Sequence, residues 1–401
     1  MTFIKTPVKG MRDFLPKEMA MREYVLSVMK DTYENFGFQL IGTPTVEHIE
    51  NLTSKQGGEN EKLIFKILKR GEKLDLENIQ NENDLVDAGL RYDLTVPLAR
   101  LYAGNMNNLP MPFRALQIGY SYRAERPQRG RYRELMQCDL DILGEKSNLA
   151  EIELISAVVT FLKRLDFKSF TVRINDRRIL MRMIEVVGLP EEKQEDIFIA
   201  LDKMDKIGIE GVREELLKLE LDSTKVDAYL AFFENTTDFA TFCEQIHLDN
   251  DVCIFMEQIL DNVKKVQDVT LVFDPTLVRG MGYYTGPIFE IAADGLASSI
   301  GGGGRYDTMI EKFANVSVSA VGFSIGFERL LLLLQERDFR VPVVKEKKAF
   351  VFQNDEKLSE LLCMVKDLRE KGQIVKVVRK SKNFKFQRES LINEGYQVEE
   401  W

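Results

Sequence analysis

Apolar residues recur at helical spacing in several parts of the chain. The clearest pattern runs from Tyr24 to Phe36, where apolar side chains return every three or four positions. Gly37 follows, at the place where a helix commonly ends on glycine. The same periodicity predicts helices over residues 148–161 and 327–336.

Shorter apolar runs, bounded by glycine, proline or charged turns, have the length and pattern of strands. Pro44 falls inside the first of them and removes one ladder hydrogen bond, so that strand is expected at a sheet edge or an interface. This position favours a dimer contact. The predicted strands cover residues 38–47, 64–67, 89–94, 113–122, 136–143, 170–175, 269–274, 284–292 and 318–326.

Strand patterns stop between residues 177 and 265, where apolar helical faces alternate with faces rich in Glu and Lys. The sheet is therefore expected to be interrupted in sequence and completed in space. Residues 71–84 predict an exposed loop. The predicted parts are a first core segment at 1–176, a helical insertion at 177–265, a second core segment at 266–340, and an α/β appendage at 345–401 with strand, helix and strand at 349–352, 358–371 and 374–378.

Composition is that of a globular protein long enough for two or three domains, with 401 residues of which 44% are hydrophobic. No run approaches the roughly 18 apolar residues of a membrane span, and no signal core precedes the first helix. We therefore expect a cytoplasmic protein without a membrane segment. The formal charge of −9 disfavours broad nucleic-acid binding, so any such contact should be local. Four cysteines and two histidines lack metal-site spacing.

Arginines concentrate in the turn between the strands at 113–122 and 136–143. The segment YRAERPQRGRYRELMQ, which begins at Tyr122, has arginine at positions 123, 126, 129, 131 and 133. Guanidinium groups bind phosphates and carboxylates bidentately. A single arginine-rich turn is more often a solvated hairpin, so its meaning depends on the other segments.

Three glycine-rich segments supply further candidates. The segment LVRGMGYYTGPIFEI, from Leu277, places Arg279 at a strand end, where glycines allow a ligand to approach the backbone. The alternative interpretation, a tight turn with two core tyrosines, leaves Arg279 unexplained. IGGGGRYDTMI, from Ile300, lacks the Lys-Ser/Thr of a phosphate loop and alone predicts a flexible turn. AVGFSIGFERLLLLL leads from a strand into a helix and places Arg329 where it could face a ligand.

Together and in this order, these segments resemble the class II aminoacyl-tRNA synthetases, and the tyrosine segment with KGMRDFLP at Lys9 resembles the histidyl-tRNA synthetase family. The resemblance covers roughly residues 1–334, and several separated motifs agree. It implies an α/β (α+β) fold with a mixed, mainly antiparallel sheet flanked by helices. It also implies activation of L-histidine with ATP and Mg²⁺, transfer to tRNA(His), and a homodimer, because Pro44 falls in the dimer-interface motif.

The resemblance implies roles for individual residues, of which Arg123, Arg279 and Arg329 are the catalytic ones. Arginines suit a reaction in which a carboxylate meets a triphosphate, and an α-carboxyl with a pKa of about 3.5 needs no general base. The ATP-binding set is Arg123 at the α-phosphate, Glu125 near the adenine, Arg131, Glu328 as a neighbour of Mg²⁺, and Arg329 at the γ-phosphate. The histidine-binding set is Asp93, Thr95, Gln137 near the amino group, Asp141 at the imidazole, Arg279 at the carboxylate, Tyr283 and Tyr284.

Two departures from the family pattern keep alternatives open. Gly282 stands where the family usually has an acidic residue. Residues 345–401 resemble only the first half of the family's anticodon-binding domain, so anticodon recognition is expected to be weak or absent. One alternative is a histidine-binding regulatory subunit that acts with the catalytic subunit of ATP phosphoribosyltransferase. Another is a paralogue that activates histidine for a carrier other than tRNA. The presence of all three arginines favours the synthetase.

Overall fold

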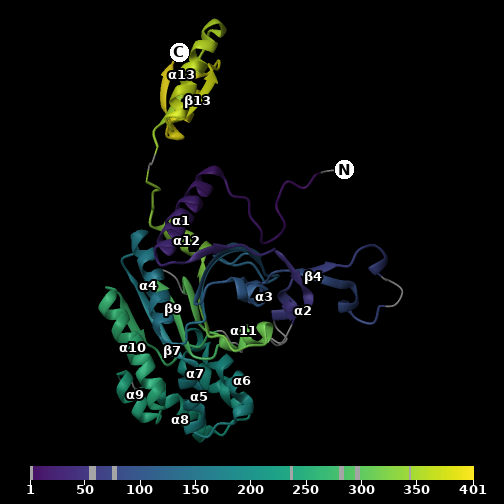
Figure 1. Cartoon of the computed structure of the whole chain (residues 1–401), viewed down its shortest axis with the longest axis vertical. Helices are drawn as coiled ribbons and strands as arrows, with labels where there is room; N and C mark the ends of the chain where they lie inside the picture. The colour runs from purple at the N-terminus through teal and green to yellow at the C-terminus, as the bar shows by residue number, and fades with distance from the viewer. Residues whose placement is uncertain are drawn as a thin grey trace. The chain divides into compact units, whose positions relative to one another are not determined.

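The computed structural model describes residues 3–53, 60–74, 79–234, 238–279, 284–293, 299–342 and 345–401. The chain divides into two compact units, Met1–Phe339 and Arg340–Trp401, whose elements are labelled in Figure 1. None of the helices in these ranges is both long and apolar enough to cross a membrane.

An eight-stranded mixed sheet forms the centre of the first unit, in the order β1-β5-β6-β11-β10-β9-β7-β8. The two outer pairs are parallel, and the inner pairs are antiparallel. The predicted mixed, mainly antiparallel sheet is confirmed. The strands are β1 (Gln39–Ile41), β5 (Phe113–Tyr122), β6 (Glu134–Leu143), β7 (Phe170–Asp176), β8 (Thr270–Phe273), β9 (Pro287–Ala293), β10 (Gly301–Arg305) and β11 (Ala320–Gly326).

One face of the sheet packs against α1 (Pro16–Asn35), α4 (Leu149–Arg164) and α12 (Phe327–Glu336). Alternate residues of β6 and β11, among them Leu140 and Phe323, join the apolar side chains of these helices in one core. The helices predicted from apolar periodicity are thus confirmed. Gly37, just beyond α1, has a φ of +77°, which suits glycine after a helix end.

The opposite face packs against two helices that the periodicity did not predict, α3 (Thr95–Asn105) and α11 (Asp307–Ala314). The first carries a proline within its first turn, where helices tolerate it, and the second is too short to show a clear period. The remaining residues of β6 and β11 face this side. Leu143 and Ala320 pack on the two helices, and farther along the strands the same face becomes polar.

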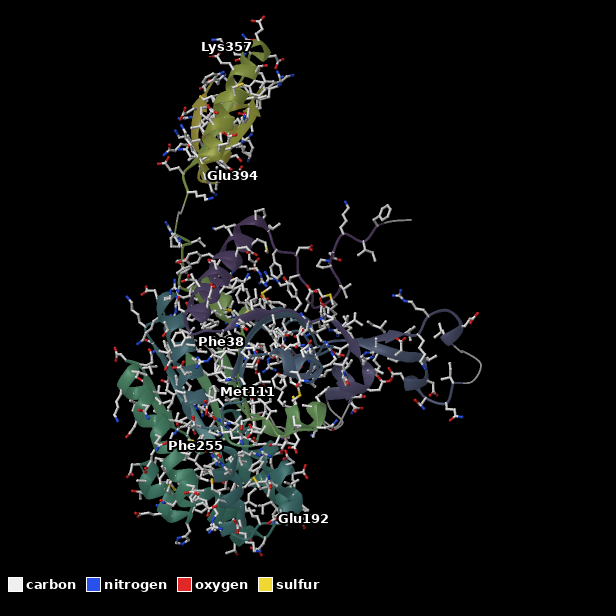
Figure 2. The ribbon with its side chains drawn as sticks, viewed as in Figure 1. Phe38, Met111, Glu192, Phe255, Lys357 and Glu394 are labelled. Carbon is white, nitrogen blue, oxygen red and sulfur yellow. The ribbon has the colours of Figure 1, made fainter. Side chains whose placement is uncertain are left out.

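The described residues between β7 and β8 form helices joined by turns, where the sequence predicted helices. Figure 1 shows these helices gathered beside the part of the sheet that contains β7. Phe255 of the last helix, labelled in Figure 2, contacts the core, with the guanidinium groups of Arg178 and Arg305 5.4 and 5.8 Å from its ring centre. The helices are α5 (Arg177–Val186), α6 (Gln194–Leu201), α7 (Met204–Lys218), α8 (Ser223–Glu234), α9 (Phe239–Gln245) and α10 (Asn250–Val266).

Two local predictions near Pro44 were wrong. The single strand expected over residues 38–47 is two strands in different sheets, because the chain breaks at the proline between β1 and β2 (Val46–His48). The strand expected at 89–94 is β4 (Val86–Leu90), which pairs with β2 and β3 (Lys66–Leu68) in a small second sheet. The described residues of the loop at 71–84 are mostly exposed, as expected.

The expectation of a flexible turn at Gly301–Gly304 was also wrong, because these residues form β10 in the middle of the sheet. Their neighbours leave no room for side chains. A Cβ on Gly303 would lie 1.9 Å from the carbonyl oxygen of Gly322 on the adjacent strand. Glycine is required here because the neighbouring strands pack closely against β10. A strand of glycines has no apolar side chains, so the hydrophobic pattern of the sequence does not predict it.

The second unit has a parallel sheet in the order β13-β12-β14. The predicted strand, helix and strand are present, but α14 and β14 were missed. Leu391 is the buried residue of α14, and the residues of β14 are largely exposed, so neither element has an apolar pattern. The elements are β12 (Lys347–Phe352), α13 (Leu358–Glu370), β13 (Ile374–Arg379), α14 (Phe384–Asn393) and β14 (Gln397–Glu400).

A buried ion pair joins α1 to α12. Arg22 donates hydrogen bonds of 2.8 Å to both carboxylate oxygens of Glu328, and the two side chains are 1% and 6% exposed. The rings of Phe14 and Phe327 lie 4.0 and 5.0 Å from the guanidinium carbon. The pair therefore fixes the start of α12, where Arg329 follows Glu328.

Replacing Arg22 by methionine should lower the free energy of unfolding by about 3 kcal/mol or more, because it leaves a buried carboxylate without its partner. Urea unfolding of the variant and the parent would measure the loss. Arg12→Met, which removes an exposed pair with Glu18, should cost under about 1 kcal/mol. Equal losses in the two variants would contradict the role assigned to the buried pair.

Candidate active site

A cavity of about 1080 Å³ lies on the face of the sheet that also packs against α3 and α11. Every predicted site residue in the described part of the chain lines it. Tyr283 lies outside the described residues, as does Gly282. The lining includes Asp93, Thr95, Arg123, Glu125, Arg131, Gln137, Asp141, Arg279, Tyr284, Glu328 and Arg329.

The turn between β5 and β6 brings Arg123 and Arg131 to this cavity. The backbone N–H of Arg123 donates to the carbonyl of Arg133 at 2.8 Å, and the N–H of Arg133 donates to the carbonyl of Gly10 at 2.8 Å. Arg123 also donates through Nε to the carbonyl of Tyr92 at 3.2 Å and lies 4.4 Å from the ring centre of that tyrosine. The arginine-rich turn is therefore anchored to the KGMRDFLP segment and is not a freely solvated hairpin.

Ser299 connects the other two predicted catalytic arginines. Its hydroxyl accepts a hydrogen bond from Nη2 of Arg279, and its backbone carbonyl accepts one from Nη1 of Arg329 at 2.9 Å. Arg279 also donates through Nε to the carboxylate of Glu290. A Cβ on Gly302 would lie 2.9 Å from the guanidinium carbon of Arg279, so this glycine of β10 makes room for the arginine.

Positive charge accumulates where these segments meet. Burial, followed by the positive charges of Arg131, Arg279 and Arg123 in that order, lowers the pKa of Arg329 to about 10. The neighbouring guanidinium groups therefore repel that of Arg329, although a guanidinium with this pKa remains protonated at neutral pH. A polyanion bound among them would relieve the repulsion and accept bidentate hydrogen bonds.

The acidic part of the cavity lies on β6. Asp141 is 4% exposed and accepts a hydrogen bond of 2.5 Å from the hydroxyl of Tyr306. Gly322, its partner on β11, has no side chain to fill this space, since a Cβ there would lie 2.0 Å from Oδ1 of Asp141. Burial raises the pKa of Asp141 to about 7, although the Tyr306 hydrogen bond acts in the opposite direction.

The raised pKa of Asp141 predicts a pH-dependent contribution to stability. Folded Asp141 keeps its proton up to a pKa of about 7, whereas an unfolded aspartate loses it near 3.8. The folded state therefore binds more protons between these values, so the contribution of Asp141 to stability is greatest below about pH 4 and is lost as the pH rises through 7. A difference of about 3 pH units corresponds to roughly 4 kcal/mol.

Asp141→Asn should remove this contribution, so its unfolding free energy in urea should fall less than that of the parent between pH 5 and pH 8. Asp166→Asn, in which the carboxyl is exposed, should follow the parent. Parallel pH dependences for Asp141→Asn and the parent would show that Asp141 titrates normally.

Asp93, Thr95 and Gln137 complete the predicted histidine site. Asp93 accepts a hydrogen bond of 3.1 Å from the N–H of Val96 in the first turn of α3, and burial raises its pKa. Thr95 is the first residue of that helix. The amide Nε2 of Gln137 donates to the hydroxyl of Ser324 at 3.1 Å. Its Oε1 is buried and has no hydrogen-bond partner within the described ranges.

The remaining predicted residues differ in how they meet the cavity. Tyr284 packs beside Gly304 of β10, where a Cβ would approach its ring to 3.1 Å. The backbone carbonyl of Glu125 accepts a hydrogen bond from Arg133 at 3.1 Å. Both carboxylate oxygens of Glu328 bond to Arg22, which gives no support to its expected place beside Mg²⁺. Among the residues described, no cluster of three or more His, Cys, Asp or Glu could hold a metal ion.

Several residues of the cavity were not predicted from sequence. The alternation of β6 would have indicated Asp139, which lies between Gln137 and Asp141 on the same face of the strand. The others show no local signal, since their importance depends on contacts with distant strands. They include Ser299, Glu290, Tyr306 and Ser324.

Comparison with known proteins gives a consistent result. A sequence model described as histidyl-tRNA synthetase matches residues 10–330. A histidine–tRNA ligase of Leifsonia xyli is 43% identical over 395 residues, covering 95% of this chain and 91% of that protein. The crystal structure of histidyl-tRNA synthetase from Nostoc has a TM-score of 0.82 at 24% identity and covers 98% of this chain and 90% of that chain.

A structure from Bacillus halodurans is described as an ATP phosphoribosyltransferase regulatory subunit/histidyl-tRNA synthetase. It has a TM-score of 0.80 at 22% identity and covers 100% of this chain and 99% of that chain. At these identities the two solved structures support the fold alone.

Proposed function

Because the chain belongs to the histidyl-tRNA synthetase family, we propose that it is a histidine–tRNA ligase that uses ATP to activate histidine. The observation that carries the proposal is the convergence of Arg123, Arg279 and Arg329 on one cavity that also contains Gln137 and Asp141. Such a cavity has positive charge for a triphosphate and a carboxylate, and acceptors for an ammonium group and an imidazole.

In the first step, a carboxylate oxygen of histidine attacks the α-phosphorus of ATP. A carboxylate oxygen–phosphorus bond forms, the bond to the β-phosphate oxygen breaks, and pyrophosphate leaves. Arg279 is assigned to the carboxylate, Arg123 to the α-phosphate and Arg329, with Arg131, to the outer phosphates. Preorganised cations offset the repulsion between the two anions and stabilise charge that develops at the phosphorus. Glu125 is assigned to the adenine.

In the second step, a terminal ribose hydroxyl of tRNA(His) attacks the activated carbonyl carbon. The new ester bond forms as the bond to the phosphate oxygen breaks, AMP leaves, and the hydroxyl proton is released. The net charge of −9 is consistent with a local tRNA contact and not with an extensive basic surface.

Selection of histidine is assigned to the acidic end of the cavity, together with Asp93, Thr95, Tyr283 and Tyr284. The buried Oε1 of Gln137 has the chemistry to accept from an ammonium group. Asp141, held by Tyr306, has the chemistry to accept from an imidazole N–H. A site that hydrogen-bonds its substrate rejects analogues that lack those groups by up to roughly 10⁴-fold.

The triphosphate implies Mg²⁺, which would neutralise part of the phosphate charge. Guanidinium groups are not metal ligands, so the four arginines of the cavity would contact the phosphates, and Mg²⁺ would be held mostly by phosphate oxygens and water.

A homodimer is proposed through the edge of the sheet near Pro44, where β1 is the outermost strand and Leu40 is 58% exposed. A cytoplasmic location remains a prediction.

The regulatory-subunit alternative is not favoured, since the curated relatives are named histidine–tRNA ligases. The Bacillus halodurans description keeps it as the second candidate. A ligase must catalyse histidine-dependent ATP–pyrophosphate exchange and must charge tRNA(His). Exchange without charging would instead support activation for another carrier. The regulatory function would be supported if the protein showed neither activity but made an ATP phosphoribosyltransferase catalytic subunit respond to histidine.

A further inference from the structure

Three side chains on neighbouring strands form a hydrogen-bonded relay at the wall of the cavity. The amide of Gln137 donates to Ser324 Oγ at 3.1 Å, and this hydroxyl donates to Asp139 Oδ1 at 2.5 Å. Asp139 and Ser324 lie directly opposite each other in the pairing of β6 with β11. Asp139 is 4% exposed, and the roles assigned above do not account for a buried carboxylate at this position.

Hydrogen-bonding capacity fixes the direction of the relay. A carboxylate only accepts, so the single hydroxyl hydrogen of Ser324 is committed to Asp139. The hydroxyl oxygen then accepts from Gln137, which must turn its NH₂ group toward the serine. The carbonyl Oε1 of Gln137 is left over, and in the described part of the molecule this buried oxygen has no partner. Leaving such an acceptor unpaired costs stability, so a donor from a ligand would complete it.

We propose that Asp139 and Ser324 are positioning residues that hold the carbonyl of Gln137 toward the α-ammonium group of the substrate. The inference rests on the proposed activation of histidine. An ammonium group is purely a donor, so a carbonyl at this point binds it and an NH₂ group repels it. Without the relay, the side-chain amide of Gln137 can rotate by half a turn and direct its NH₂ group toward the ammonium group.

The charges around the relay point to a cationic ligand. Asp139 is influenced by the carboxylates of Asp141 and Asp93 and by the guanidinium of Arg123. Burial, followed by the negative charge of Asp141, raises the pKa of Asp139, while the Ser324 hydrogen bond lowers it. A bound ammonium group would favour the ionised carboxylate, which is the form that sets the direction of the relay.

Two substrate analogues separate this role from general damage to the cavity. Histidinol retains the amino group and the imidazole, whereas 3-(imidazol-4-yl)propanoate lacks the amino group. Each would be tested as a competitive inhibitor of histidine-dependent ATP–pyrophosphate exchange with the full chain and with Ser324→Ala and Asp139→Asn. Ser27→Ala and Asp166→Asn, both on exposed positions away from the cavity, are matched controls.

We expect both relay variants to raise the KM for histidine and the inhibition constant of histidinol about tenfold, the effect of weakening one hydrogen bond to a charged group. The inhibition constant of the propanoate and the KM for ATP should stay unchanged. An equal rise for both analogues, or no rise for either in variants with the parent's melting temperature, would overturn the proposal. If the parent shows no exchange, the proposed function fails, and calorimetric binding of the two analogues still tests the relay.

Discussion

Arg279→Ala should lower the rate of histidine-dependent ATP–pyrophosphate exchange about 100- to 1000-fold, as loss of a preorganised donor to a developing charge does in other enzymes. Arg279 is held by Glu290 and Ser299 and packs against Gly302 of β10. Its guanidinium is therefore fixed before a ligand binds, and alanine removes this preorganised donor and its charge. The KM for histidine should rise more than the KM for ATP.

Arg279→Lys should recover little of this activity, because an ammonium group cannot bond Glu290, Ser299 and a carboxylate with the planar geometry of guanidinium. Arg213→Ala is the control, since that arginine pairs with Asp227 on exposed helices of the insertion. Full exchange activity in Arg279→Ala would remove Arg279 from the mechanism.

Arg329→Ala should lower kcat/KM for ATP by a similar factor, about 100-fold or more, while the KM for histidine changes little. The positive charges of Arg131, Arg279 and Arg123 repel the guanidinium of Arg329, and this repulsion contributes to its lowered pKa of about 10. Removing it should relieve that repulsion, so the ligand-free variant should be at least as stable as the parent even though it binds ATP poorly.

Exchange kinetics at varied ATP, combined with thermal unfolding of the ligand-free protein, would check both parts of this expectation. Arg164→Ala removes an arginine that pairs with Asp31 outside the cavity, and it should leave both measurements unchanged. An Arg329→Ala enzyme with a normal kcat/KM for ATP would contradict the assignment of Arg329 to the phosphates.

Much of the sheet could be predicted because its strands have apolar residues on at least one face. The strand expected at 113–122 is β5, and that expected at 136–143 is β6, which begins two residues earlier. β10 was not recognised because four of its five residues are glycines. Its conformation depends on backbone contacts with β9 and β11, and a local pattern of side chains cannot report such contacts.

The candidate site was predictable where residue type and motif coincide, as at Arg123, Arg279 and Arg329. The residues that hold these groups were not. Ser324 meets Asp139 across 185 positions of sequence, and this contact exists only because β6 pairs with β11. Likewise, the ion pair between Glu328 and Arg22 depends on the packing of α1 in the folded chain. The sequence shows only that Glu328 carries a negative charge, and that charge suggested a neighbour of a metal ion.

A structure of the full chain with histidine and ATP would test the central claim most directly. We predict that the histidine carboxylate lies within hydrogen-bonding distance of Arg279, and that the phosphates contact Arg123 and Arg329. Density for the nucleotide at another surface, or phosphates that contact neither Arg123 nor Arg329, would contradict the account.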